Sequence, residues 1–262
     1  MTPAMLRRLA ALVVTALVAL LCASGAQAAR PARAAAALRI LFIGNSYTYT
    51  NDLPKLVREL ALASGAARPV ETEAVTAGGV SLKWHWEQGA ARAALMQKKW
   101  DYVVLQDFST LPLTDAAAVR QYMRLFDEQI RQAGARTVLY LTWARATSPE
   151  TQAELNRVYY GIGGELAARV APVGPAWAIA RELDPRLQLY ENDNSHPTLA
   201  GSYLAAYVLQ LTLFGKAPRM SDVPSGLSPI EHRTLLLAAL RATARSDWLA
   251  RMSRRRGVDV PD

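Results

Sequence analysis

The stretch Leu38-Arg-Ile-Leu-Phe-Ile-Gly-Asn-Ser-Tyr47 is an apolar run that ends abruptly in turn-forming residues. Residues 38–43 have the length and the branched or aromatic content of a buried parallel strand. Gly44 gives the backbone the freedom for a sharp exit from that strand. Ser46 is therefore expected at the carboxyl end of the first strand, where open α/β sheets bind their ligands. This position makes Ser46 a candidate nucleophile, although Gly-Asn-Ser alone is also typical of an ordinary turn before a helix.

Strand-like and helix-like segments alternate after this stretch. Further strands are expected at residues 70–76, 100–106, 137–143 and 171–173, with a last strand-like segment at 187–190. Helices are expected at residues 52–64, 82–96, 115–133, 148–170, around 177, 198–214 and 228–248. Strands that alternate with helices at this spacing predict an α/β fold with a parallel sheet and helices on both faces.

The amino terminus has the pattern of a secretory signal peptide. Arg7 and Arg8 precede an apolar run at residues 9–23, and Ala26-Gln-Ala28 is a small-residue cleavage site. An uncleaved membrane anchor is the alternative, for which the apolar run is short. We expect residues 1–28 to be removed and residues 29–262 to form a single domain, with a carboxyl-terminal helical extension at about residues 228–250. The mature protein is then secreted or periplasmic and has no stable membrane span.

The composition argues against several kinds of site and partner. The only cysteine, Cys22, lies in the predicted signal peptide, so the mature chain has no disulfide and no thiolate metal site. The three histidines lack metal-ligand spacing, so neither a metal nor another cofactor is expected. The net charge of +8 comes partly from the arginine run at residues 254–256. We interpret that run as a solvated tail rather than a nucleic-acid or membrane-surface site. Nothing in the sequence indicates the oligomeric state.

One of the three histidines has a carboxylate at a useful distance along the chain. Asp193 precedes His196 by three residues in a polar loop, which lets the carboxylate reach the imidazole Nδ1 and leaves Nε2 free to accept a proton from a serine. His85 lies between two tryptophans on a predicted helix, and His232 lies in the last helix beside Glu231. His196 is therefore the candidate general base, with an exposed loop residue or a helix cap as the alternative.

Three short blocks in this order resemble the SGNH (GDSL-like) hydrolase family. The blocks are Gly44-Asn-Ser46, Gly79-Val-Ser81 and Asp193-Asn-Ser-His-Pro197, and the resemblance extends over about residues 38–215. It implies a three-layer α/β/α sandwich with a flavodoxin-like parallel sheet. It also implies that Ser46 is the nucleophile, His196 the general base and Asp193 the acid that orients it.

The resemblance further implies an oxyanion hole, in which this sequence departs from the family. The backbone N–H groups of Ser46 and Gly79 are the expected donors. The family adds an asparagine from a Gly-x-Asn-Asp block after the third strand, where this chain has Gln106-Asp-Phe-Ser109. Gln106 is the expected third donor and Ser109 the fallback. Alternatively, Gln106 simply ends the strand.

Three residues are candidates for contact with a substrate. Asn45 adjoins the nucleophile, Trp84 lies on the helix predicted after the second strand, and Trp143 ends the fourth predicted strand. Tryptophan rings near a site can stack on sugars or line an acyl pocket, although core packing is their commoner role.

The leading hypothesis is an exported serine esterase that forms an acyl-enzyme. The family implies short-chain or O-acetyl esters, often on carbohydrates, so the expected partner is a small-molecule or glycan ester. One alternative is an acyltransferase that uses the same triad. The other is a non-catalytic carbohydrate-binding protein on the same fold, which the missing asparagine block and the tryptophans suggest.

Overall fold

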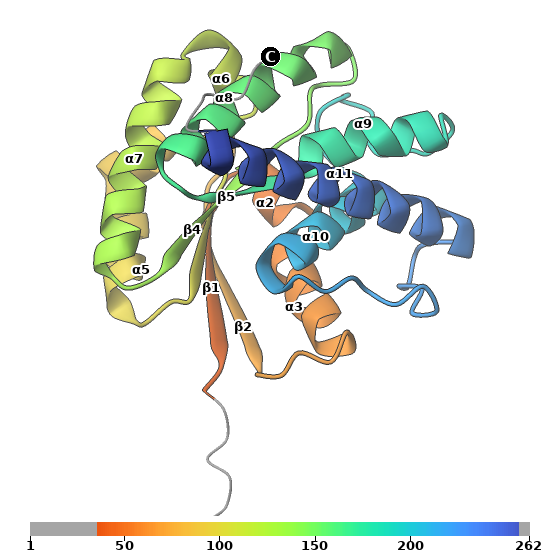
Figure 1. The fold of residues 1–262 in the computed structure, drawn as a ribbon, viewed down its shortest axis with the longest axis horizontal. Coiled ribbons are helices and arrows are strands. Elements are labelled where there is room, and N and C mark those ends of the chain that lie inside the picture. The colour runs from red at the N-terminus through yellow and green to blue at the C-terminus, as the bar shows by residue number, and fades with distance from the viewer. Residues whose placement is uncertain (1–35, 257–262) are drawn as a thin grey trace, which may run out of the picture. The chain divides into compact units, whose positions relative to one another are not determined.

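A five-stranded parallel sheet organises the protein (Figure 1). The computed structural model describes the backbone of residues 36–256 and the side chains of residues 36–248, so the predicted signal peptide lies outside the described residues. The strand order is β2-β1-β3-β4-β5. The strands are β1 Leu38–Gly44, β2 Val70–Thr76, β3 Tyr102–Leu105, β4 Arg136–Leu141 and β5 Arg169–Pro172.

Helices cover both faces of the sheet, which confirms the predicted three-layer α/β/α arrangement. In Figure 1 the sheet is seen nearly edge-on, with α5, α7 and α8 on one side and α3, α10 and α11 on the other. On the first side lie α4 Leu82–Gln88, α5 Ala90–Gln97, α7 Ala116–Gln132 and α8 Gln152–Glu165. On the second side lie α3 Leu53–Ala63, α9 Val173–Leu183, α10 Leu199–Phe214 and α11 Pro229–Arg256. The short elements are α2 Ser46–Tyr49, η1 Thr50–Asp52, α6 Leu111–Thr114 and η2 Pro149–Thr151.

Strand β1 is apolar throughout because both of its faces are buried. Ile40 and Phe42 pack into the core beneath α3, α9, α10 and α11, whereas Leu41 and Ile43 pack into the core beneath α4, α5, α7 and α8. Successive side chains of a strand point to opposite faces, so a strand between two helical layers needs an unbroken apolar run. This requirement explains the sequence of residues 38–43.

The strand order puts the end of β1 at the point where the winding of the sheet reverses. The chain leaves β1 to form β2 on one side and then crosses to form β3 on the other, where Ile43 pairs with Leu105. Loops that leave neighbouring strands in opposite directions open a crevice at the carboxyl edge, where open sheets of this kind bind ligands. Ser46 directly follows this edge.

Three predicted elements differ from the structure. The helix expected at residues 82–96 is broken into α4 and α5 at Gly89, which has a φ of +80°. The helix expected to reach residue 170 ends at Glu165, because β5 takes residues 169–172 into the sheet. Residues 187–190 form no strand within residues 36–256: a single antiparallel bridge joins Tyr190 to Pro197. The short helix α6 was not predicted.

Helix α10 approaches the loop of residues 187–197 at its first turn, and this contact requires a glycine. A Cβ atom added to Gly201 would lie 2.5 Å from the Leu189 carbonyl oxygen and 2.5 Å from the Trp177 ring. Both distances are far below ordinary van der Waals contact. The start of α10 therefore packs directly against the backbone of the loop that carries Asp193 and His196.

We predict that Gly201→Ala destabilises the protein by about 1–3 kcal/mol, because the added methyl group overpacks this contact. Gly161→Ala is the matched control, since a Cβ at this exposed position of α8 meets nothing within 4 Å. Alanine should stabilise α8 there by roughly 0.5–1 kcal/mol through its helix propensity. Urea unfolding of both variants measures the two effects. Stabilisation by both substitutions would contradict the close approach at Gly201.

Candidate active site

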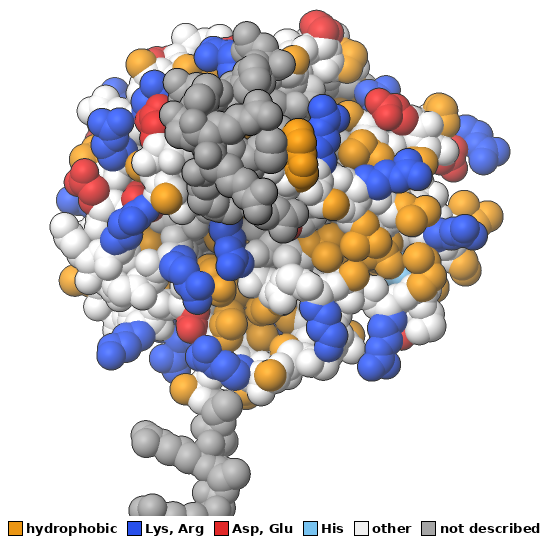
Figure 2. Space-filling model, in the orientation of Figure 1, with side chains coloured by type: hydrophobic (Ala, Val, Ile, Leu, Met, Phe, Trp, Pro, Cys, Tyr) orange, Lys and Arg blue, Asp and Glu red, His pale blue; other side chains and the backbone are white. Residues whose placement is uncertain are grey.

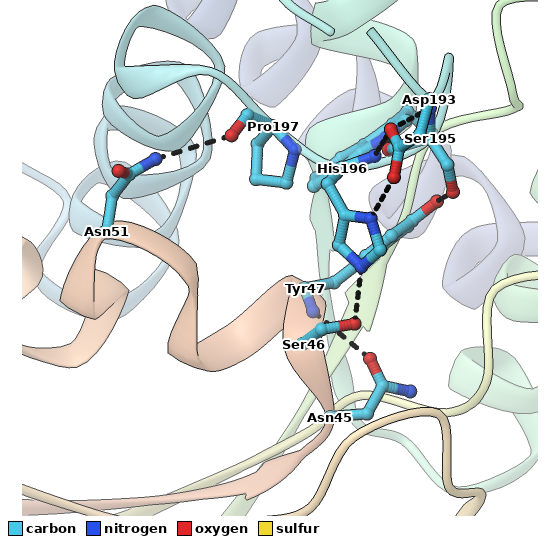
Figure 3. A network of polar contacts seen from close by, with 9 residues as sticks. Asn45, Ser46, Tyr47, Asn51, Asp193, Ser195, His196 and Pro197 are labelled. Carbon is cyan, nitrogen blue, oxygen red and sulfur yellow. Dashed lines mark hydrogen bonds and ion pairs between the residues drawn. The ribbon is translucent and has the colours of Figure 1, made fainter. Parts of the chain in front are cut away.

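Ser46, His196 and Asp193 form one continuous chain of hydrogen bonds (Figure 3). Ser46 Oγ lies 2.8 Å from His196 Nε2. His196 Nδ1 contacts Asp193 Oδ2. The structure thus brings together the three residues that the sequence pattern had singled out, although 150 residues separate Ser46 from His196.

The protonation states follow from the partners of Asp193. Its carboxylate accepts a hydrogen bond from the His196 ring and two more from the backbone N–H groups of Ser195 and His196, at 3.0 and 2.9 Å. These bonds, that from the imidazole first, lower the pKa of Asp193 to about 2. An ionised carboxylate accepts only, so Nδ1 carries the proton and Nε2 is left to accept one from Ser46.

The loop that carries Asp193 and His196 is closed on itself. The Glu191 N–H donates to the His196 carbonyl at 2.8 Å, and the Asn194 N–H donates to the Glu191 carbonyl at 3.0 Å. Asn194 sits at the tip with a φ of +57°, a left-handed conformation that asparagine tolerates better than most residues. Its carbonyl accepts a hydrogen bond from the Ala146 N–H, which ties the loop to the segment that follows β4. The acid and the base are therefore held as one unit.

The turn that presents Ser46 is anchored by the side chain of Asn45, which is almost fully buried. Asn45 Oδ1 accepts the Tyr47 N–H and so caps α2, while Nδ2 donates to the Val80 carbonyl at 2.9 Å. Gly44 is required just before it, because a Cβ there would lie 2.4 Å from Thr48 Oγ1. Asn45 was predicted to contact substrate. The structure corrects this prediction, since all of its polar atoms face the protein interior.

Gln106 directly follows β3, and its side chain forms hydrogen bonds with the turn around Asn45. Its Oε1 accepts from the Asn45 N–H at 2.9 Å and from Thr48 Oγ1 at 2.8 Å. Its Nε2 donates to Asn45 Oδ1 and to the Asp107 carbonyl. The side chain is fully buried and both amide protons are used. This geometry argues against Gln106 as an oxyanion donor and agrees with the alternative that it ends the strand.

Two backbone N–H groups at the site have no hydrogen-bond acceptor within residues 36–248. The N–H groups of Ser46 and Gly79 donate to no other group of the described protein. Gly79 has a φ of +66°, and a Cβ built on it would meet nothing within 4 Å, so this turn is open to an approaching molecule. Tyr49 Oη lies beside the neighbouring Gly78, and the Tyr49 side chain is 48% exposed.

Trp143 does not face a substrate site as predicted. It is buried, and its ring stacks on Tyr47 on one side and on Trp177 on the other, with centroids 4.5 and 3.9 Å apart. Its Nε1 donates to the Ser195 carbonyl at 3.0 Å. Tyr47 Oη lies 2.7 Å from Ser195 Oγ. Trp143 and Tyr47 therefore both bond Ser195, the residue that precedes His196. Trp84, by contrast, is 39% exposed on α4, and its role stays a prediction.

Tyr47, Ser195 and Asp107 are residues near the site that the sequence reasoning missed. Tyr47 and Ser195 carried no signal of their own, since each was read only as the neighbour of a catalytic candidate. Asp107 stood in the segment that replaces the asparagine block. Its Oδ1 accepts the N–H groups of Leu82 and Phe108 at 2.9 and 2.7 Å, while its Oδ2 has no partner among the described residues. Asp107 thus anchors the start of α4.

No metal centre is present among the residues that the structure describes, since no three potential ligands among His, Cys, Asp and Glu lie together there. The same residues contain no helix long and apolar enough to span a bilayer.

Comparison with solved structures shows which proteins share this fold. A candidate SGNH hydrolase from Slackia heliotrinireducens superposes with a TM-score of 0.59 and 29% identity, over 68% of this chain and 99% of that one. This chain is similar to an SGNH hydrolase in sequence and has the SGNH fold. The SGNH fold is shared with a DUF4886 family protein from Bacteroides uniformis, at a TM-score of 0.64 and 19% identity over 80% and 96% of the two chains. It is also shared with the acetyl xylan esterase AlAXEase. That structure superposes with a TM-score of 0.56 and 16% identity, over 66% of this chain and 98% of the esterase chain. No family model and no curated protein matches the sequence.

We predict that Asp107→Asn stabilises the protein most at neutral and alkaline pH. Burial raises the pKa of Asp107 to about 6 against the opposing backbone hydrogen bonds, so its ionised form costs folding free energy above that pH. Two pKa units correspond to roughly 3 kcal/mol. An asparagine oxygen can accept the same two N–H bonds without the buried charge. The advantage of the variant should therefore be largest above pH 6 and disappear towards pH 4.

Urea unfolding of both proteins between pH 4 and 8 measures this difference. The pKa of His85 is lowered by burial, and its effect on stability has the opposite sign in this range, but it is common to both proteins. The lowered pKa of Asp193 affects stability only below about pH 4. A stability difference that does not vary with pH would contradict a buried ionised Asp107.

Proposed function

We propose that this SGNH protein is an exported serine esterase that hydrolyses short-chain or O-acetyl esters. The observation that carries the proposal is the unbroken hydrogen-bond path from Ser46 Oγ through His196 to Asp193. A serine, a histidine in the correct tautomer and a carboxylate in this order form the arrangement that activates a hydroxyl nucleophile. A secretory pattern at residues 1–28 supports export to a secreted or periplasmic location.

Acylation begins when Ser46 Oγ attacks the ester carbonyl and its proton passes to His196 Nε2. Asp193 stabilises the imidazolium that forms and keeps the ring in place. The carbonyl oxygen becomes an oxyanion, for which we assign the free N–H groups of Ser46 and Gly79 as donors. Collapse of the tetrahedral intermediate breaks the ester bond, and the His196 proton goes to the departing alcohol. An acyl-Ser46 enzyme remains.

Deacylation repeats the same steps with water. His196 Nε2 takes a proton from the water molecule as its oxygen attacks the acyl carbonyl, and the proton then returns to Ser46 Oγ. The carboxylic acid leaves and the free enzyme is restored. Water reaches this site readily, because the side chains of His196 and Asp193 are 40% and 48% exposed.

The oxyanion hole of this proposal has two backbone donors and no side-chain donor. Gln106 is locked inside the fold, and the fallback candidate Ser109 is buried, with its hydroxyl beside that of Tyr47. One oxyanion donor typically contributes about 100- to 1000-fold in turnover. We therefore expect this enzyme to be slower than a relative that has the asparagine.

A carbohydrate ester is the substrate class that the surroundings of Ser46 favour. Tyr49 lies exposed beside Gly78, and Trp84 is partly exposed on the helix that follows the same turn. Aromatic rings of this kind stack on the apolar faces of sugars. The fold shared with an acetyl xylan esterase agrees with an O-acetyl ester as substrate, from which acetic acid is released.

Two alternatives use the same residues differently. An acyltransferase must keep water away from the acyl-enzyme until the acceptor arrives, and the exposed Asp193 and His196 offer no such protection. A carbohydrate-binding protein has no need for a serine hydrogen-bonded to an oriented histidine. Hydrolysis is therefore the first of the three to test.

We predict that Ser46→Ala lowers the hydrolysis of p-nitrophenyl acetate by the protein from residue 29 onward by on the order of 10³-fold or more. The nucleophile is lost while the other side chains of the site stay in place. The matched control is Ser221→Ala, which removes an exposed hydroxyl that bonds only Asp222 and should not change the rate. Rates near background for the wild-type protein and both variants would exclude the esterase.

We predict that Tyr47→Phe lowers kcat roughly 10- to 100-fold and leaves KM nearly unchanged. Loss of the bond to Ser195 Oγ lets the loop with Asp193 and His196 shift relative to Ser46, and small displacements of catalytic groups have effects of this size. The ring and its stack on Trp143 are retained. Tyr203→Phe on α10 is the control. A purely structural role would lower the melting temperature without this split between kcat and KM.

A further inference from the structure

Helix α11 presents an unusual face to solvent. Its inner face packs on α9 and α10 through buried residues that include Leu235, Leu236 and Ala239. At 100° per residue, the opposite face carries an apolar row along its centre. The row consists of Ile230, Leu237, Leu240, Ala244 and Trp248. Ile230 is 71% exposed, Leu240 37% and Trp248 55%, so three large apolar side chains lie in water on one helix.

Arginines flank the apolar row. Arg233, Arg241 and Arg245 are exposed on the same outward face, and none of the three forms an ion pair with an acid within residues 36–248. Asp247 is the one acidic side chain of this face in the described part of the helix. Figure 2 looks onto α11 and shows hydrophobic side chains gathered where its first turns lie, with Lys and Arg side chains around them. The helix continues in sequence with four further arginines up to residue 256.

This combination selects one kind of partner. A soluble polyanion would engage the arginines and leave the apolar row in water. A second copy of the chain would bring arginines of like charge together, which disfavours self-association. An anionic phospholipid surface satisfies both features, because arginines bind phosphates while leucine, isoleucine and tryptophan enter the boundary between headgroups and acyl chains.

We propose that the outward face of α11 docks the protein onto an anionic phospholipid surface. The helix lies in the plane of the interface, with the apolar row inserted and the flanking arginines at the level of the lipid phosphates. The interaction is peripheral and salt-sensitive, since part of it is electrostatic. The sequence-based interpretation of the arginines at residues 254–256 as a solvated tail concerns side chains outside the described residues and stays a prediction. The proposed docking does not depend on the esterase activity.

The test is co-sedimentation of the protein from residue 29 onward with lipid vesicles. The described residues contain both hydrophobic cores, and omission of residues 1–28 keeps the apolar run at 9–23 from inserting by itself. We expect binding to vesicles of mixed phosphatidylglycerol and phosphatidylcholine, and little binding to phosphatidylcholine alone. Arg241→Gln with Arg245→Gln should weaken the binding roughly 10- to 30-fold.

The apolar contribution is tested by Leu240→Ser with Trp248→Ser, which should weaken vesicle binding at least tenfold. The matched control is Leu62→Ser with Met96→Ser, two apolar side chains that are 52% and 68% exposed elsewhere on the surface. This control should bind as the wild type does. All substituted side chains are at the surface, and thermal unfolding confirms that each variant is folded.

Four results would overturn the proposal. The first is an absence of binding to phosphatidylglycerol vesicles at low salt. The second is vesicle binding that the α11 variants and the control weaken equally. The third is a concentration-dependent dimer, seen without vesicles and lost in the Leu240→Ser/Trp248→Ser variant, which would assign the face to a second copy. Binding to heparin in place of vesicles would assign it to a soluble polyanion.

Discussion

The pairing of two buried amides, Asn45 and Gln106, is the interaction on which the site depends. Asn45 follows β1 and Gln106 follows β3, so their hydrogen bonds connect the two strand ends that flank the reversal of the sheet. Together they fix the backbone that precedes Ser46 and cap the helix that follows it. Both groups are neutral, so the link carries no penalty for a buried charge and is insensitive to pH.

An aromatic column holds the other half of the site in place. Tyr47, Trp143 and Trp177 stack in succession, and the first two bond the side chain and the backbone of Ser195. Stacking gives these rings a preferred mutual geometry as well as buried area. The column therefore connects α2, the segment after β4 and α9 to the loop that carries the acid and the base.

Local patterns in the sequence predicted what depends on local chemistry. Residues 38–43 form the expected strand because burial on both faces demands a continuous apolar run, and Asp193 reaches His196 because a separation of three residues within one loop allows this contact. Two readings stayed open for Trp143 and for Gln106, for a different reason. A tryptophan or an amide after a strand can point into a crevice or into the core, and the direction depends on neighbours brought in from distant parts of the chain, such as Trp177 and Asn45. Gly89 is a local signal for the break between α4 and α5, and the prediction of one helix at residues 82–96 did not use it.

The two contacts within the catalytic triad depend on different parts of the structure, because Asp193 and His196 share one closed loop and Ser46 lies outside it. The contact between acid and base is local and is stabilised by hydrogen bonds within residues 190–197. The contact between base and nucleophile is tertiary and needs the whole sheet edge to be intact. On partial opening of the molecule, the dyad can persist after the serine has separated from it. Loss of nucleophile activation is then an early reporter of loosening in the sheet, ahead of any change in the imidazole–carboxylate pair.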